Sequence, residues 1–293
     1  MEHYTATFEL LEGPFGAIVV AVLGALFGSF ANVCIYRMPP SEKHPNGRSV
    51  STPPSHCFDC GTGVKWYDNV PILAYLWLKG ACRHCKTSFS TRYLFVEAAT
   101  AMLFLAAFLF VFHIAYTDEP SLRQWLRLFV YVSFLWTMVV ITFIDLDHKL
   151  ILNRVTFKAI PFFLLAGVFL LKQDWKTGVI GALVGYGLVR GISDGYKALT
   201  GKYGMGYGDG KLLAIVGGLM GWQAVVISLF VGSIFGTVIS LALLSFQKTE
   251  EKSTSLGKIE VPFGPYLVLG AISFLFMGSW FKNHFGLLWG IIE

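Results

Sequence analysis

Long apolar segments separated by short polar ones make up most of the chain. Seven segments are long and apolar, and residues 210–221 form a shorter eighth; the seven are 14–36, 94–116, 125–146, 155–172, 177–199, 222–246 and 262–281. A helix needs roughly 20 mainly apolar residues to cross a bilayer. A soluble protein with buried helices can imitate one such segment, but hardly seven. The pattern therefore predicts an all-α polytopic membrane protein with about eight transmembrane helices.

The composition supports this class. Hydrophobic residues make up 55% of the 293 residues and charged residues 14%, whereas a soluble domain carries about 25% charged residues. The residues before the first apolar segment are acidic (Glu2, Glu9 and Glu12) and contain no basic stretch. A secretory signal peptide would begin with such a stretch, so we interpret the first segment as a spanning helix.

The distribution of basic residues predicts the orientation in the membrane. Residues 37–92 contain eight lysines and arginines but only three acidic residues. Short cytoplasmic loops are enriched in Lys and Arg, so we expect this loop in the cytosol and the N-terminus outside. The net charge of +5 reflects the same bias. It indicates contact with a lipid bilayer and no nucleic-acid partner.

Two polar regions interrupt the apolar pattern, at residues 37–93 and 247–260. The first is too small to fold around a hydrophobic core of its own. We therefore predict three parts: residues 1–36 with the first transmembrane helix, a cytosolic loop at 37–93, and a membrane-embedded catalytic core at 94–293.

Four cysteines explain how the polar loop could fold. They form two CxxC pairs with 21 residues between them, Cys57, Cys60, Cys82 and Cys85. This spacing is typical of a four-thiolate zinc site, and four protein ligands leave no position for a substrate. We predict a structural Zn²⁺ ion. The alternatives are disulfides, which a reducing cytosol disfavours, a redox dithiol, and a site in which His56 or His84 replaces one cysteine.

Acidic residues at the ends of apolar segments are candidates for chemistry, because charge in a membrane is costly. By the predicted orientation they all lie at cytosolic helix ends: Glu97, Asp145, Asp147, Asp194 and Asp209. Asp145 and Asp209 then share one depth, as in an aspartic protease whose two carboxylates share a proton. Asp147 would point about 200° away from Asp145 on a helix. The alternative is that both acids cap helices and face water.

Asp209 lies in the glycine-rich stretch GMGYGDGK, residues 204–211. Without Cβ atoms, Gly206 and Gly208 would let a substrate backbone approach the carboxylate. A phosphate cradle is disfavoured, because an acid would repel the phosphate and no strand precedes the glycines. Lys211 would favour the charged form of Asp209 if its ammonium came close, or would reach toward lipid headgroups. Glu97 would meet a substrate amine, or pair with a nearby arginine such as Arg92.

These fragments, in this order, resemble the prepilin peptidases, also called type IV leader peptidases. The matching segments run along nearly the whole chain: Gly28-Ser29-Phe30-Ala31-Asn32-Val33 with Ile35-Tyr36-Arg37, the two CxxC pairs, Asp68-Asn69-Val70-Pro71, Ser90-Thr91-Arg92-Tyr93 before Val96-Glu97, Ile144-Asp145 through Asn153, residues 204–211, and Pro262-Phe263-Gly264-Pro265. Each fragment is weak by itself, but their common order is specific.

The resemblance implies a membrane aspartic endopeptidase of the GxGD class in the bacterial inner membrane, with its active site and zinc loop facing the cytosol. Such enzymes cleave the leader of type IV prepilins and of type II secretion pseudopilins after a glycine. Carried over by residue, the catalytic pair is Asp145 and Asp209. Most members also methylate the new N-terminal amine with S-adenosylmethionine. The residues for that step are unknown, with Glu97, Lys211, Gly206 and Gly208 as possible supporting groups.

One position departs from the family pattern, since Leu152 stands before Asn153 where a proline is usual. A proline would help to end the preceding helix, so we expect this turn to depend on Asn153. Two other functions remain as alternatives. One is a transporter in which the acids carry protons or cations, and the other is a non-catalytic scaffold for pilus or secretion assembly.

Overall fold

A computed structural model of the chain describes residues 11–201, 205–246, 262–284 and 286. In this part of the chain every regular element is a helix, apart from three isolated β-bridges in the loop that follows the first helix. The predicted all-α class is therefore confirmed for the described residues. Gly204 and the charged connection at 247–260 lie outside them.

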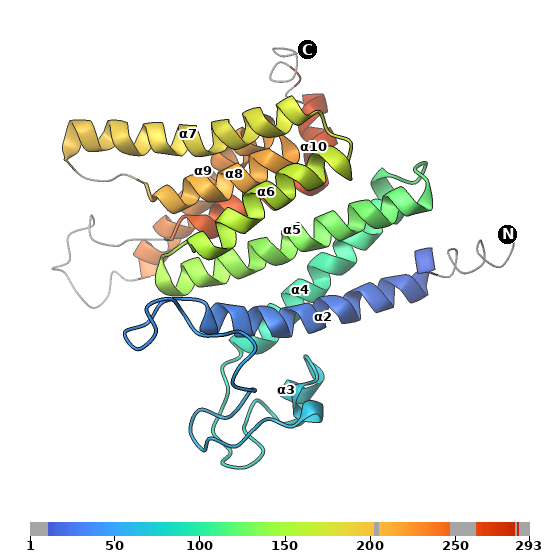
Figure 1. Cartoon of the computed structure of the whole chain (residues 1–293), viewed down its shortest axis with the longest axis vertical. Helices are drawn as coiled ribbons and strands as arrows, with labels where there is room; N and C mark the ends of the chain where they lie inside the picture. Colours follow the sequence, from blue (N-terminus) through green and yellow to red (C-terminus); the bar gives the residue numbers. More distant parts are fainter. Residues whose placement is uncertain (1–10, 202–204, 247–261, 285, 287–293) are drawn as a thin grey trace, which may run out of the picture. The chain divides into compact units, whose positions relative to one another are not determined.

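Each predicted apolar segment corresponds to one helix (Figure 1). The elements are α2 (Pro14–Arg37), η1 (Trp66–Asn69), α3 (Leu73–Trp77), α4 (Arg92–Leu109), η2 (Phe110–Ala115), α5 (Ser121–His148), α6 (Asn153–Phe169), α7 (Trp175–Thr200), α8 (Tyr207–Met220), α9 (Trp222–Phe246) and α10 (Gly264–His284). The helices begin and end within a few residues of the predicted bounds because polar or glycine-containing segments limit the apolar ones.

Five of the described helices are long and apolar enough to cross a membrane: α2, α4 with its continuation η2, α5, α9 and α10. Many of their large apolar side chains are exposed, as Ile18 and Leu26 of α2 illustrate. Lipid-facing surfaces need such side chains, because water is absent from the hydrocarbon core. The chain is therefore a multi-pass membrane protein. The helices α6, α7 and α8 do not meet the same limits of length and composition.

The chain divides into two compact units, Met1–Val140 and Ile141–Glu293. In the first unit α2 packs along α4. A Cβ atom on Gly24 would lie 2.8 Å from Cα of Ala101, and one on Gly28 would lie 2.7 Å from Cα of Glu97. Small residues allow two membrane helices to approach this closely. The predicted three-part organisation (1–36, 37–93 and 94–293) stays a prediction.

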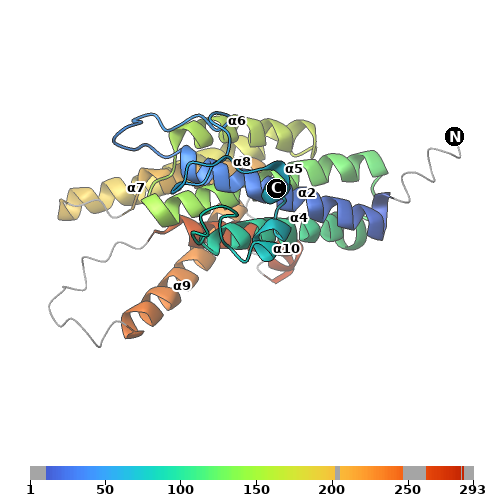
Figure 2. The same cartoon turned by 90° about the horizontal axis from the view of Figure 1, so that it is seen from below.

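In the second unit α8 is the central helix, and α6, α7 and α9 pack around it (Figures 1 and 2). Glycines again permit the contact, since a Cβ on Gly181 of α7 would lie 2.2 Å from the carbonyl oxygen of Gly217 in α8. Nearly every residue of α8 from Asp209 to Leu219 is buried. A helix enclosed on all sides is apolar all round, so Asp209 is an exception at its first turn.

Candidate active site

The two acids predicted to form a pair both belong to the second unit and are both buried. Asp145, in the last turn of α5, is 5% exposed, and Asp209, in the first turn of α8, is 8% exposed. The carboxylates are close enough for the charge of Asp145 to act on Asp209. Asp147, in contrast, is exposed, as its position two residues along the helix implies. The structure thus brings together Asp145 from α5 and Asp209 from α8.

The start of α10 holds the Asp145 carboxylate. The amide of Gly264 donates a hydrogen bond to Oδ2 of Asp145 over 3.0 Å. A Cβ atom on Gly264 would lie 2.6 Å from the same oxygen, which is closer than any real Cβ contact, so only glycine fits this position unless the carboxylate moves. Gly264 belongs to Pro262-Phe263-Gly264-Pro265, one of the sequence fragments that resemble the prepilin peptidases.

The end of α7 holds Met205 and Tyr207, which lead into the first turn of α8 with Asp209. The hydroxyl of Ser193 donates to the carbonyl oxygen of Met205 over 2.8 Å, and the hydroxyl of Tyr207 donates to Oδ1 of Asp194 over 2.7 Å. Ser193 is fully buried. From sequence, Asp194 was predicted only as an acid at a helix end, and Ser193 was not predicted as a site residue. The one sequence feature that could have indicated Ser193 is its position as a small polar residue in the last turns of an apolar helix.

Gly206 and Gly208 lie at the start of α8, and Gly208 packs closely against another part of the chain. A Cβ atom on Gly208 would lie 2.8 Å from Cβ of Ile151, which belongs to the turn after Asp145. Gly206 is the N-cap residue of α8, and its carbonyl accepts the amide of Asp209 over 3.1 Å. For Gly208 the structure therefore shows close packing of the start of α8 against the turn after α5, and the predicted room for a substrate backbone stays a prediction.

The turn between α5 and α6 keeps a conformation suited to proline although Leu152 occupies the position. Leu152 has φ −71° and ψ 126°, and α6 begins at the next residue, Asn153. Proline would fix φ near the same value. The side chain of Asn153 accepts a hydrogen bond from the ammonium of Lys211, which also lies 5.2 Å from the ring centre of Phe157. Lys211 is thus directed to the start of α6, and it joins the helix that carries Asp209 to the helix that follows Asp145 in the chain.

The four predicted zinc ligands form a cluster in the first unit. Their sulfur atoms all lie within 4.8 Å of one another, with Sγ of Cys57 and Sγ of Cys85 3.6 Å apart. Sulfurs bound to zinc at about 2.3 Å in a tetrahedron are separated by similar distances. Four thiols with this arrangement fit a metal ion of the zinc type.

The two CxxC turns have the same backbone design. The amide of Cys57 bonds to the carbonyl of Thr62, and the amide of Cys82 bonds to the carbonyl of Thr87, over 2.9 and 2.8 Å. The residue after each second cysteine, Gly61 or Lys86, has a positive φ of 68° or 60°. The hydroxyl and amide of Thr87 lower the pKa of Cys85 to about 6, which favours the thiolate that binds a metal.

Comparisons with known proteins extend the picture to the whole chain. A model of the bacterial peptidase A24 N-terminal domain matches residues 22–111, and a model of the type IV leader peptidase family matches residues 132–241. Two relatives named prepilin leader peptidase/N-methyltransferase are each 34% identical to this chain. The protein from Aeromonas hydrophila matches 91% of this chain and 94% of its own length, and the protein from Dichelobacter nodosus matches 95% of this chain and 97% of its own length. The chain belongs to the type IV leader peptidase family. No solved structure was found to match it.

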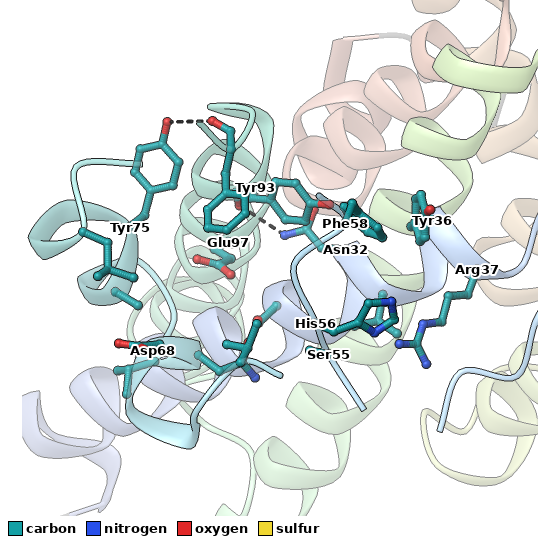
Figure 3. Close-up of a pocket in the computed structure, with 18 of the residues that line it drawn as sticks. Asn32, Tyr36, Arg37, Ser55, His56, Phe58, Asp68, Tyr75, Tyr93 and Glu97 are labelled. Carbon is teal, nitrogen blue, oxygen red and sulfur yellow. Dashed lines mark hydrogen bonds between the residues drawn. The ribbon is translucent and has the colours of Figure 1, made fainter. Parts of the chain in front are cut away.

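Glu97 is the remaining residue of the predicted site, and it lies in the first unit. It is 8% exposed and lines a cavity between the C-terminal half of α2, the polar loop and the start of α4 (Figure 3). Its carboxylate accepts hydrogen bonds from the amide of Ile72, over 2.7 Å, and from the Ser29 hydroxyl. In the part of the chain that the structure describes, no ion pair joins Glu97 to Arg92 or to another cation.

Proposed function

We propose that the chain is a prepilin peptidase and N-methyltransferase. It would remove the leader of type IV prepilins or type II secretion pseudopilins after a glycine, and then methylate the exposed N-terminal amine. Membership of the leader peptidase family and the names of relatives at 34% identity support this assignment. The observation that carries it is the pair of buried carboxylates, Asp145 and Asp209, in the matched region.

The proposed cleavage uses the two carboxylates in different protonation states. The ionised acid takes a proton from water, and the resulting hydroxide attacks the scissile carbonyl carbon. The protonated acid donates its proton to the carbonyl oxygen, so the intermediate carries no net charge on that oxygen. Two close carboxylates resist simultaneous ionisation, which keeps one proton on the pair. Their titration then belongs to the pair as a whole.

The neighbours of each acid support different roles for the two. Oδ2 of Asp145 already accepts a hydrogen bond from the Gly264 amide, and such a bond favours the charged form. The negative charge of Asp145 beside it then favours the protonated form of Asp209. We therefore assign Asp145 as the ionised base and Asp209 as the protonated acid of the resting enzyme.

The membrane arrangement is also part of this proposal. We propose that α6, α7 and α8 complete an eight-helix bundle, with the acid pair and the zinc loop at the cytosolic face of the bacterial inner membrane. A prepilin carries a basic leader in the cytosol and an apolar helix in the bilayer. Acids at a membrane surface would meet the junction between those two parts.

The four cysteines and the methyl donor have separate places in the proposal. We assign Zn²⁺ as the metal, held by all four cysteines in a structural role, because their sulfurs leave no open ligand position. S-adenosylmethionine, when bound, would supply a methyl group activated by a sulfonium, and attack by the neutral N-terminal amine would leave a neutral thioether and a cationic methylated amine.

The exchange of each acid for its amide tests the cleavage proposal. Asp145→Asn and Asp209→Asn should each lower the cleavage rate of a purified prepilin at least about 100-fold, because general acid and base groups contribute about that factor or more. Asp147→Asn is the matched control, since Asp147 is exposed on the same helix as Asp145. Cleavage at the wild-type rate by the Asp145→Asn/Asp209→Asn double variant would exclude the aspartic mechanism. A wild type that never cleaves would favour the transporter or scaffold.

A further inference from the structure

The first unit contains a cavity that the cleavage mechanism does not use. It is lined by the C-terminal turns of α2, by the polar loop, by α3 and by the start of α4. Asn32 of α2 donates to the carbonyl oxygen of Tyr93 over 3.1 Å, which joins two of these walls. Figure 3 shows Glu97 beneath Tyr93 on one side of the cavity and Arg37 on the other. The cavity therefore presents an acidic and a basic group to the same space.

Among the residues that the structure describes, no cation lies against Glu97, the second acid of this cavity. Its described partners are the Ile72 amide and the Ser29 hydroxyl, which are neutral donors. Asp68 also lines the cavity, but two nitrogens of Arg83 bind it over 2.5–3.1 Å, and this contact holds the pKa of Asp68 below its usual range. A buried carboxylate without a cation favours a positively charged ligand, because pairing offsets the cost of its burial.

Aromatic rings and two arginines complete the lining. Tyr36, Phe58 and Tyr93 contribute ring faces or edges, and the rings of Tyr36 and Phe58 lie 4.9 Å apart. The guanidinium of Arg48 lies 5.5 Å from the ring centre of Tyr36, and Arg37 donates to the carbonyl of Ser49. Aromatic faces bind flat bases and cations, and a guanidinium binds carboxylates. The cavity thus combines groups for a base, a cation and a carboxylate.

We propose that this cavity is the binding site for S-adenosylmethionine. This methyl donor is an adenine nucleoside with a sulfonium and an amino-acid end, and each of those parts has a complementary group in the lining. Glu97 would hold the positively charged part, the aromatic rings would hold the adenine, and Arg37 or Arg48 would hold the carboxylate. The inference rests on the methyltransferase half of the proposed function and gives it a location outside the acid pair.

Binding of radiolabelled S-adenosylmethionine to the purified full-length protein, measured by equilibrium dialysis without pilin, tests the site directly. Glu97→Gln should weaken binding by about tenfold or more, because it removes a charge-assisted contact. Tyr36→Leu should also weaken donor binding, whereas Tyr36→Phe should keep the wild-type affinity, because phenylalanine retains the ring face. Glu42→Gln is the matched control, since Glu42 is an exposed glutamate of the same loop outside the cavity lining.

Parallel measurements separate failure of this inference from failure of the proposed function. Retained zinc and cleavage of a prepilin show that each variant is folded, and mass spectrometry of the product shows methylation. If the wild type binds the donor and Glu97→Gln and Tyr36→Leu bind it equally well, the cavity is not the donor site although the function stands. If the wild type cleaves but neither binds the donor nor methylates, the methyltransferase proposal itself is wrong.

Discussion

Gly264 occupies the tightest position beside the proposed catalytic pair. Its amide bonds to Oδ2 of Asp145, and a Cβ atom there would lie 2.6 Å from that oxygen. Gly264→Ala should therefore move the carboxylate and lower the cleavage rate by about tenfold or more, since small misplacements of catalytic groups cost up to about 100-fold. The measurement is the initial rate of prepilin cleavage by the purified variant.

Gly278→Ala is the control for that substitution. Gly278 lies in the same helix, and a Cβ atom there would meet only the ring of Phe274 at 3.8 Å, an ordinary contact. It should leave cleavage unchanged, and both variants should retain most of the thermal stability of the wild type. Equal activity in Gly264→Ala and the wild type would show that Asp145 does not depend on this contact.

The two turns that carry the four cysteines allow a prediction at the scale of one turn. Gly61 and Lys86 occupy equivalent places in the two CxxC turns, both with positive φ. A Cβ atom on Gly61 would touch nothing within 4 Å, so Gly61→Ala should cost about 1–2 kcal/mol from backbone conformation alone. Lys86→Gly should instead stabilise its turn, because glycine adopts this conformation without strain.

Competition with a chromophoric chelator measures this difference. Loss of metal should be fastest in Gly61→Ala and slowest in Lys86→Gly, with the wild type between them. The opposite order would mean that the free turns, without metal, do not adopt the equivalent conformations seen here. Gly63→Ala is a suitable control, since Gly63 has no positive φ and no neighbour that a Cβ atom would meet.

The elements of this fold could be predicted from sequence to a large extent, but the contacts between them could not. The length of each apolar segment predicted each major helix. The spacing of residues on a helix predicted that Asp145 and Asp147 point in different directions, and Asp145 is buried whereas Asp147 is exposed. The bond from Ser193 to Met205 depends on how α7 is rotated and shifted against the loop before α8. Apolar periodicity does not determine that register, because α7 packs through glycines on more than one turn.

Gly208 illustrates the same limit. A glycine beside an acid indicates only that a side chain is excluded there, and sequence does not say what excludes it. The structure identifies Ile151, more than fifty residues earlier, as the excluding group. The conformation of Leu152 is a similar case, since φ near −71° preserves the turn without the proline of the family pattern.

At the scale of the whole molecule, the two proposed activities belong to different compact units. The acid pair lies in residues 141–293, and the cavity around Glu97 lies in residues 1–140. The two sites share no residue, and substitutions without shared partners usually add within about 0.5 kcal/mol, so we expect nearly independent free energies of binding. Asp209→Asn should therefore abolish cleavage and still bind S-adenosylmethionine with an affinity within about twofold of the wild type. A synthetic peptide that begins at the mature N-terminus should also be methylated by this variant, which mass spectrometry can detect. Loss of donor binding in a folded Asp209→Asn protein would instead show that the two activities depend on one another.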